Sequence, residues 1–250
     1  MQNRIKLMVI DDSAVYRSWL IGNLEKDPRF EIVGYAVNAF DAKNKIPVLK
    51  PDVLTLDIEM PGMSGLDFLK EYLPSHPIPV ILVSSLNVRV FDALAAGAVD
   101  FVRKPDMDSH VLKEAFLSML MAKLTAAAAS RVRIPPAAPA SPPSVKMPAL
   151  RTSLSTKLAA CRDMVIAIGA STGGTEAILE VLRQFPENMP GVVITQHMPA
   201  GFTAMYAERL NRLCKMEVRE AKSGDRLRPG LALLAPGGLQ MKVVPMGNGY

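Results

Sequence analysis

The sequence predicts an α/β protein built from two units, each with a parallel sheet. Short apolar runs alternate with amphipathic stretches in residues 1–124, and the same alternation returns in residues 161–250. A Pro- and Ala-rich tract separates the two regions, and a tract of this composition cannot bury a core. With 250 residues and 49% hydrophobic content, the chain is long enough to form two modest cores.

The first region contains five apolar runs of strand length, each followed by a stretch with helical periodicity. Because repeated strand–helix units form a parallel sheet with helices on both faces, we expect a five-stranded sheet. The expected strands are Lys6–Ile10, Glu31–Ala36, Val53–Asp57, Val80–Ser84 and Val99–Arg103. The expected helices are Ala14–Lys26, Phe40–Val48, Gly65–Tyr72, Val88–Ala96 and Ser109–Lys123.

Residues 125–160 are predicted to form a basic linker. Six basic and no acidic residues lie between positions 125 and 162, and they account for the net charge of +5. The regions on either side are nearly neutral, so neither unit is expected to present a nucleic-acid-binding face. No recognition-helix pair follows the tract, which also disfavours a DNA-binding regulator.

The second region, residues 161–250, again alternates strand-like and helical patterns, which favours a smaller α/β unit. The expected strands are Met164–Ile168, Val192–Gln196, Glu217–Arg219, Leu231–Leu234 and Met241–Val244. The expected helices are Thr175–Phe185 and Thr203–Leu213.

Several classes of protein are disfavoured by composition. No run approaches the ~18 apolar residues of a membrane span, and the N-terminus lacks the apolar segment of a signal peptide. We therefore expect a cytoplasmic protein without membrane insertion. Two cysteines in 250 residues argue against a disulfide framework.

Three carboxylates fall at strand ends in the first region: Asp11, Asp12 and Asp57. Because these loops meet at one edge of a parallel sheet, the three side chains are expected to converge, and Mg²⁺ suits such oxygen ligands. Lys104 and Ser84 follow neighbouring strands and would contact a phosphoryl group carried by an aspartate. The alternative is that each acid only caps a turn or helix, an explanation that suits one residue better than five in this order.

The first region resembles the receiver domain of bacterial response regulators, which has a flavodoxin-like fold. The resemblance rests on Asp11-Asp12, the run Leu-Asp57-Ile-Glu-Met-Pro-Gly, Ser84-Ser85, Phe101 and Lys104-Pro105. It implies that Asp57 accepts a phosphoryl group from a histidine kinase. It also implies Mg²⁺ bound by Asp11, Asp12, Asp57 and the backbone carbonyl of Glu59, with Ser84, Phe101 and Lys104 as switch residues.

Ser171 lies in the pattern Gly169-x-Ser171-x-Gly173, where a predicted strand turns into a helix, as in a nucleophile elbow. Backbone N–H groups at the start of a helix can receive a developing oxyanion. His197 ends the next strand and is a candidate base, although a lone histidine often only satisfies a turn. A phosphate-binding turn is the alternative, but Thr175-Glu176 replaces the required Lys-Ser/Thr.

The runs Gly-Ala-Ser171-Thr172-Gly-Gly, Gln196-His197-Met-Pro and Ala235-Pro-Gly resemble the chemotaxis response-regulator protein-glutamate methylesterases. The resemblance implies a Rossmann-like hydrolytic domain without a cofactor. Ser171, assisted by Thr172, would hydrolyse γ-methyl esters of chemoreceptor glutamates and deamidate receptor glutamines. The chemotaxis histidine kinase would phosphorylate the receiver, which obstructs the active site when unphosphorylated.

The same resemblance places the third triad residue, an Asp, in a loop that the 250 residues do not include. Asp225 matches a non-catalytic segment. We therefore expect an incomplete hydrolytic domain with Ser171 and His197 alone. This leaves a second hypothesis, in which the chain is a catalytically incomplete phospho-receiver protein that acts by binding or by competing for phosphoryl groups.

Overall fold

The computed structural model describes residues 4–85, 89–130 and 164–245. The chain divides near residue 138 into two compact units, here called the N-terminal and C-terminal units. Each contains a wholly parallel sheet, so the predicted α/β class is confirmed. Residues 131–160 of the predicted linker lie outside the described residues.

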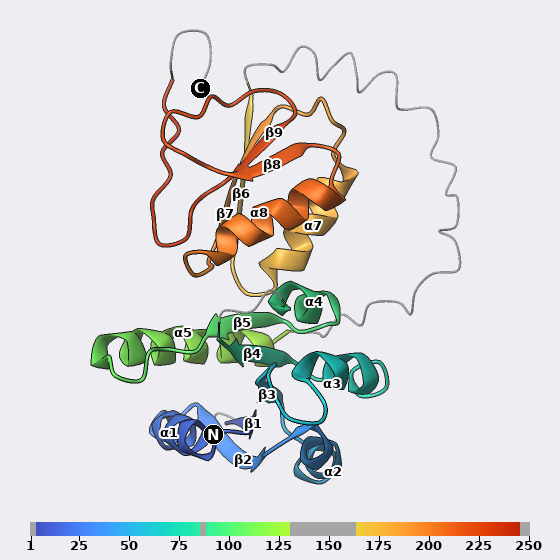
Figure 1. Ribbon diagram of the computed structural model, residues 1–250, viewed down its shortest axis with the longest axis vertical. Coiled ribbons are helices and arrows are strands. Elements are labelled where there is room, and N and C mark those ends of the chain that lie inside the picture. Colours follow the sequence, from blue (N-terminus) through green and yellow to red (C-terminus); the bar gives the residue numbers. More distant parts are fainter. Residues whose placement is uncertain (1–3, 86–88, 131–163, 246–250) are drawn as a thin grey trace. The chain divides into compact units, whose positions relative to one another are not determined.

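The N-terminal unit is built on five strands in the order β2-β1-β3-β4-β5 (Figure 1), which is the flavodoxin-like arrangement. Every residue of β3 and β4 is buried, as expected for central strands covered on both faces. Ile10 pairs with Leu56, so the residues that follow them, Asp11 and Asp57, emerge side by side. The strands are β1 Ile5–Ile10, β2 Phe30–Ala36, β3 Val53–Leu56, β4 Val80–Ser84 and β5 Asp100–Arg103.

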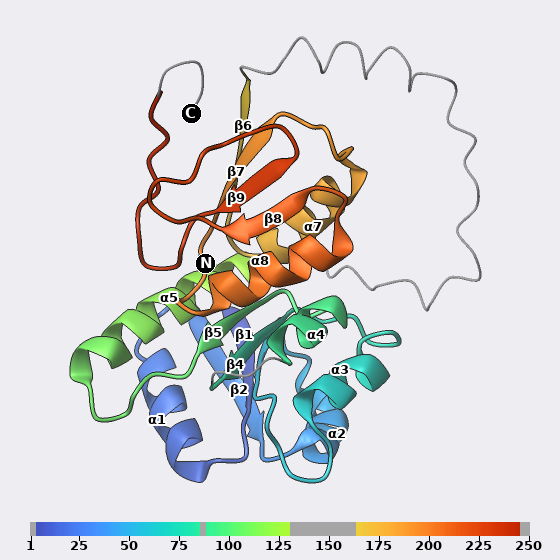
Figure 2. The same ribbon diagram turned by 45° about the horizontal axis from the view of Figure 1, so that its top comes forward.

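Helices cover both faces of this sheet, with α1 and α5 on one side and α2, α3 and α4 on the other (Figure 2). Side-chain oxygens cap four of the five helices, because Ser or Asn precedes the first turn in each case. The bounds are α1 Ala14–Leu24, α2 Ala39–Leu49, α3 Gly65–Tyr72, α4 Val90–Ala95 and α5 His110–Ala128.

Helix α5 corrects the predicted start of the linker. The sequence predicts that the helix ends at Lys123 and that the linker begins at residue 125, but α5 continues to Ala128. Leu124 and Ala127 are completely buried in the core of the unit, and alanine is the best helix former. The Ala-rich run therefore extends the helix instead of starting the spacer.

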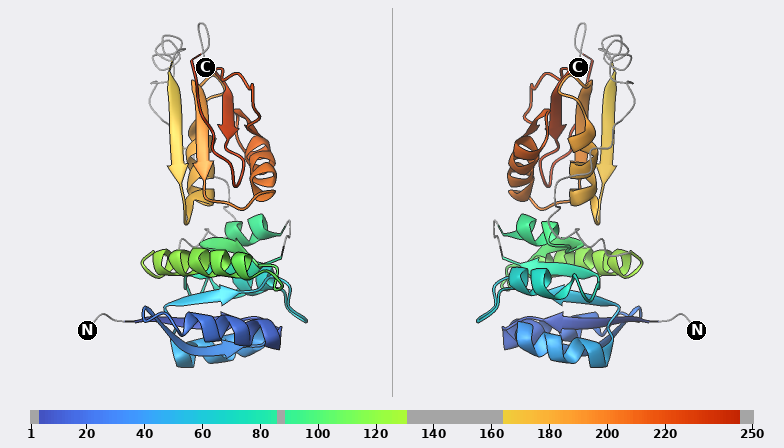
Figure 3. Two further views of the ribbon diagram at one scale, coloured as in Figure 1. Left: turned by 90° about the vertical axis from the view of Figure 1, so that its left-hand side faces the viewer. Right: turned by 90° about the vertical axis from the view of Figure 1, so that its right-hand side faces the viewer.

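The C-terminal unit contains four strands in the order β6-β7-β9-β8, all pointing the same way (Figure 3). Helices α7 and α8 pack side by side on one face, through residues such as Leu182 and Leu210 that are completely buried. The bounds are β6 Val165–Ala170, α7 Gly174–Gln184, β7 Gly191–Gln196, α8 Phe202–Leu213, β8 Glu217–Glu220 and β9 Leu231–Leu234.

The predicted strand at Met241–Val244 is wrong, since these residues form no ladder. The segment instead lines a groove of about 730 Å³ together with Val193 of β7 and Leu233 of β9. Because those residues belong to the two central strands, the segment lies over a face of the sheet instead of beside an edge strand. Its backbone therefore has no neighbouring strand with which to pair. No helix in the described part of the chain is long and apolar enough to cross a bilayer.

Candidate functional site

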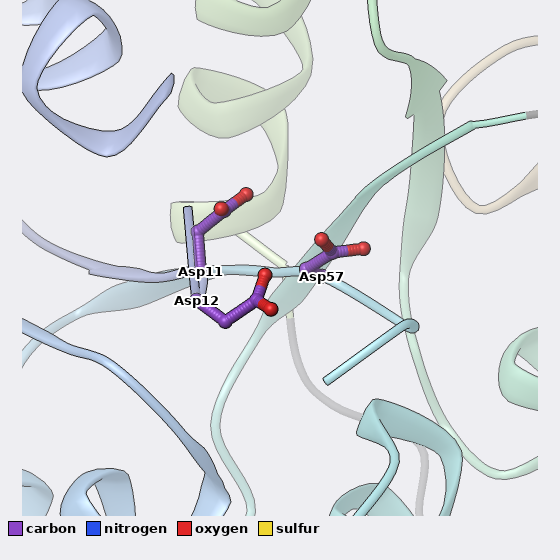
Figure 4. Close-up of side chains that lie close together, drawn as sticks. All are labelled: Asp11, Asp12 and Asp57. Carbon is purple, nitrogen blue, oxygen red and sulfur yellow. The ribbon is translucent and has the colours of Figure 1, made fainter. Parts of the chain in front are cut away.

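Three carboxylates form the first candidate site, here called the acidic site: Asp11, Asp12 and Asp57 (Figure 4). Each offers an oxygen that lies within 4.8 Å of the oxygens offered by the other two. Asp11 and Asp57 are only 2% and 5% exposed, whereas Asp12 is exposed. The structure therefore brings together the three acids that the sequence singles out.

Lys104 enters the acidic site from the end of β5. Its backbone N–H donates to the carbonyl of Ser84 at 2.8 Å, which continues the β4–β5 ladder and fixes the residue at this edge. Its Nζ lies 2.5 Å from Oδ2 of Asp57 and 2.8 Å from Oδ2 of Asp11. Burial alone would lower the pKa of Lys104, but contact with the two carboxylates outweighs it and raises the pKa.

The donor set fits a hard divalent cation such as Mg²⁺. Backbone N–H groups of Ser13 and Glu59 donate to Asp11 and Asp57 at 2.9 and 3.2 Å, which orients both carboxylates. Burial raises the pKa of Asp57, and Lys104 offsets only part of this effect. The ionised cluster thus carries an unfavourable charge that a cation bound by carboxylate oxygens would relieve.

Two further predicted residues lie beside this edge. Ser84 is 2% exposed, and among the described residues its hydroxyl has no hydrogen-bond partner, so it is available as a donor. Phe101 is equally buried and packs edge-to-face on Phe91, with ring centroids 6.4 Å apart. Their assignment as switch residues stays a prediction.

Gly65 allows helix α3 to begin directly against the loop that carries Asp57. A Cβ at this position would lie 2.2 Å from the backbone carbonyl oxygen of Asp57 and 3.0 Å from Cα of Ile58. Since both obstacles are backbone atoms, no side-chain rotation would relieve the clash. The absence of a side chain at residue 65 is therefore part of the site's construction.

The second candidate site pairs Ser171 with His197 in the C-terminal unit. Ala170 and Gln196 are partners in the β6–β7 ladder, so the residues that follow them lie next to each other. Ser171 Oγ is 3.1 Å from His197 Nδ1, and both side chains are exposed. This is hydrogen-bonding distance for a nucleophile and its base.

The turn that carries Ser171 is held by residues around it. Gly173 adopts φ +75°, and the N–H of Gly174 and the side-chain Nε2 of Gln196 both donate to the Ser171 carbonyl, at 2.8 and 2.9 Å. A Cβ on Gly174 would lie 2.2 Å from Oε1 of Gln196. Gln196 is part of the sequence motif, but the contact between its side chain and the Ser171 turn depends on tertiary structure and was not predicted. Thr172 follows Ser171 in the same turn and is half-buried.

His197 turns Nδ1 toward the serine, so Nε2 is the ring nitrogen left for an orienting group. Among the described residues, no carboxylate forms an ion pair with this ring, and its hydrogen-bonding contact is with Ser171. Asp225 accepts hydrogen bonds from Arg219 at 2.6 Å and from the backbone of Lys222 at 2.7 Å. The hydrogen bond from Arg219 lowers the pKa of Asp225. Asp225 therefore stabilises its own turn through Arg219 and the backbone of Lys222.

Comparison with known proteins gives matches in both units. The family model of the response regulator receiver domain matches residues 7–116, and that of CheB methylesterase matches residues 166–249. A protein-glutamate methylesterase/protein-glutamine glutaminase from Syntrophotalea carbinolica is 51% identical over the whole chain, which covers 71% of that relative. This chain belongs to the protein-glutamate methylesterase/protein-glutamine glutaminase family.

Other members of the family match in the same way. One from Syntrophomonas wolfei is 45% identical over 99% of the chain and 69% of its own length. The response regulator domain of Thermotoga maritima CheB is 36% identical, covers 50% of this chain and 97% of that domain, and superposes with a TM-score of 0.47. The chain thus spans about 70% of the length of the first two relatives and contains both types of domain found by the family models.

Proposed function

We propose that this chain hydrolyses γ-methyl esters of chemoreceptor glutamates, deamidates receptor glutamines, and is activated by phosphorylation of Asp57. The observation that carries the hydrolytic part is the 3.1 Å contact between Ser171 Oγ and His197 Nδ1. The names of the relatives supply the substrate class. The proposed division of labour is a receiver that ends with helix α5 at Ala128, a linker that follows it up to residue 160, and a hydrolytic part in 161–250.

The proposed reaction begins when His197 Nδ1 takes the proton of Ser171 and Oγ attacks the ester carbonyl. The tetrahedral intermediate collapses as His197 returns the proton to the leaving methoxide, which departs as methanol. For a glutamine, the leaving group is ammonia. Water, deprotonated by His197, then attacks the acyl-serine. His197 returns that proton to Oγ of Ser171 as the C–O bond breaks, which frees Ser171 and releases the glutamate product.

The negative charge that develops on the carbonyl oxygen would be stabilised by backbone N–H groups at the start of α7. The first N–H groups of a helix lack partners within the helix and carry its positive dipole end. The turn from Ser171 to Gly174 is fixed in advance by the Gln196 side chain, so these donors need no rearrangement when negative charge develops. Thr172, the next residue along, is proposed to assist.

In the receiver, Asp57 is proposed to accept the phosphoryl group from a chemotaxis histidine kinase. Asp11, Asp12, Asp57 and the Glu59 carbonyl would hold Mg²⁺, which supplies charge neutralisation for the phosphoryl oxygens when bound. Lys104 would contact the same oxygens, because its ammonium already contacts Asp57. Ser84 and Phe101 would respond to the new group. The proposed setting is the cytoplasm, without nucleic acid or membrane insertion.

The test is methanol release from methylated receptor, measured with and without a small-molecule phosphodonor. Wild type is expected to release methanol faster with the phosphodonor, Asp57→Asn is expected to lose that response, and Ser171→Ala is expected to release none. If the wild-type chain incorporates phosphate at Asp57 yet releases no methanol, the chain acts only by binding or by phosphoryl competition, and the hydrolytic proposal is wrong.

A further inference from the structure

Tyr16 borders the acidic site from the first turn of α1. Its backbone N–H donates to Oγ of Ser13, the residue that caps this helix, at 3.3 Å. Its side chain is only 7% exposed. The Nζ of Lys104 lies 4.6 Å from the centre of the Tyr16 ring, well inside the range of a cation–π interaction. The Lys104 ammonium therefore contacts the Tyr16 ring and, at the same time, the carboxylates of Asp11 and Asp57.

The Tyr16 ring is itself held in place by an aromatic cluster of Tyr16, Trp19 and Phe116. Its centroid lies 5.6 Å from that of Trp19 and 6.4 Å from that of Phe116. Lysine, in contrast, has a flexible four-carbon stem whose ammonium is free to adopt many positions. Contact with the fixed Tyr16 ring therefore restricts the Lys104 ammonium to fewer positions.

The hydroxyl of Tyr16 is not the group that makes this contact. It is buried and has no hydrogen-bond partner among the described residues. Burial and the negative charges of Asp11 and Asp57 raise the pKa of the phenol, so it stays neutral. The aromatic ring alone accounts for the contact with Lys104, which distinguishes tyrosine and phenylalanine from an aliphatic residue at this position.

We propose that Tyr16 is a positioning residue of the phosphorylation site: its ring holds the Lys104 ammonium where it contacts a phosphoryl group on Asp57. This inference rests on the proposed role of Asp57 as phosphoacceptor. It assigns Tyr16 no part in Mg²⁺ binding, since the candidate metal ligands are the oxygens of the acidic site. A purely structural role in the core would affect binding of the metal and of the phosphoryl group together.

The experiment uses the full chain and two ligands, Mg²⁺ and then beryllofluoride, a phosphoryl mimic, at saturating Mg²⁺. Binding is followed by the emission of Trp19, the only tryptophan of the chain, which lies beside Tyr16. Tyr16→Leu removes the ring, and Tyr16→Phe restores it without the hydroxyl. Tyr72→Leu is the matched control, because Tyr72 is as buried as Tyr16 and lies in the same unit, but its ring stacks on Phe68 and His76 instead of Lys104.

We expect Tyr16→Leu to weaken beryllofluoride binding about 3- to 10-fold, the size of a partly desolvated cation–π interaction, while Mg²⁺ affinity stays within about twofold. Tyr16→Phe and Tyr72→Leu are expected to bind both ligands as wild type does. If Tyr16→Leu does not fold, Tyr16→Met replaces it, since methionine adapts to irregular spaces in a core.

Equal beryllofluoride affinity in Tyr16→Leu and wild type would overturn the inference. So would a parallel loss of Mg²⁺ and beryllofluoride binding, or an equal loss in Tyr72→Leu. A wild-type chain that binds Mg²⁺ but neither beryllofluoride nor phosphate would overturn the assignment of Asp57 itself, and with it the inference on Tyr16. That result differs from the first three because it appears before any variant is made.

Discussion

The acidic site and the Ser171–His197 pair both form at the carboxyl edge of a parallel sheet, yet they treat charge differently. The acidic site gathers side chains from the ends of β1, β3 and β5, buries two carboxylates and places one ammonium between them. The serine and histidine come from two adjacent strands, and both side chains are exposed.

This difference agrees with the roles proposed above, which are phosphorylation at the acidic site and ester hydrolysis at the Ser171–His197 pair. Buried like charges are unfavourable, so the acidic site changes its energy when a cation or a phosphoryl group arrives. The serine and histidine need no such compensation, because their contact is made between exposed side chains. We infer that conformational signalling belongs to the first site and bond cleavage to the second.

The largest expected effect tests whether ester cleavage depends on the Ser171–His197 pair and is independent of the acidic site. His197→Ala is expected to lower methanol release by about 10²–10⁴-fold, the usual contribution of a general base. His110→Ala is the matched control, since this histidine is exposed at the start of α5, and it should release methanol as wild type does. Phosphate incorporation at Asp57, measured in the same preparation, should be unaffected by His197→Ala. A parallel loss of both activities would show that the two sites are not separable.

The next effect compares how rigidly the two loops are built. Gly65→Ala places a methyl group against backbone atoms and is expected to cost the N-terminal unit about 3 kcal/mol. Gly174→Ala places one against side-chain atoms, the end of Gln196 and Cβ of Ala170, and should cost less because the Gln196 amide can move aside. Urea unfolding measures both. Gly22→Ala is the control, because nothing lies within 4 Å of the added methyl group and alanine favours the helix by about 1 kcal/mol. A smaller loss for Gly65→Ala than for Gly174→Ala would contradict this ranking.

The smallest expected effect concerns how ionised Asp57 contributes to the free energy of unfolding. Because burial raises the pKa of Asp57, its ionised form destabilises the fold, and Asp57→Asn should raise the free energy of unfolding at pH 7 by about 1 kcal/mol, a typical size for one substitution. That gain should vanish as the pH falls through the raised pKa toward the ordinary value of ~3.9, and it should shrink with added Mg²⁺.

Asp225→Asn in the C-terminal unit should behave in the opposite way. The hydrogen bond from Arg219 lowers the pKa of Asp225, so ionised Asp225 stabilises the fold above the ordinary pKa of an aspartate and loses that effect as the pH falls through the lowered value. The substitution should therefore reduce stability slightly at pH 7 and have no effect in strong acid. Thermal unfolding between pH 3 and pH 7 measures both variants, and gains of the same sign would refute the contrast.

The sequence predicted the parts of this structure that local patterns specify. Each strand of the N-terminal unit was expected within about two residues of its observed bounds, because apolar runs and acidic strand ends mark them clearly. The convergence of Asp11, Asp12 and Asp57 followed from strand order alone. The pairing of Ser171 with His197 followed from their places after adjacent strands.

The failures arise where tertiary contacts decide. The helix was expected to end at Lys123 and the linker to begin at residue 125, but α5 continues to Ala128, and the burial of Ala127 keeps the run helical. Met241–Val244 has a strand-like pattern, yet it lies over a face of the sheet. Neither the ring of Tyr16 beside Lys104 nor the amide of Gln196 on the Ser171 turn leaves any periodic signal in the sequence.

The close approach of Gly174 to Gln196 has a consequence for how this chain can be altered by mutation. A side chain at position 174 would meet both the Gln196 amide and Cβ of Ala170. A shorter residue at 196 would make room beside the amide, but it would also remove the group that donates to the Ser171 carbonyl. A substitution at position 174 or 196 alone should disrupt the turn, so tolerated substitutions at these positions are expected to occur together. A mutant library intended to change the surroundings of Ser171 should therefore randomise residues 170, 174 and 196 together, because single-site libraries would sample mostly defective turns.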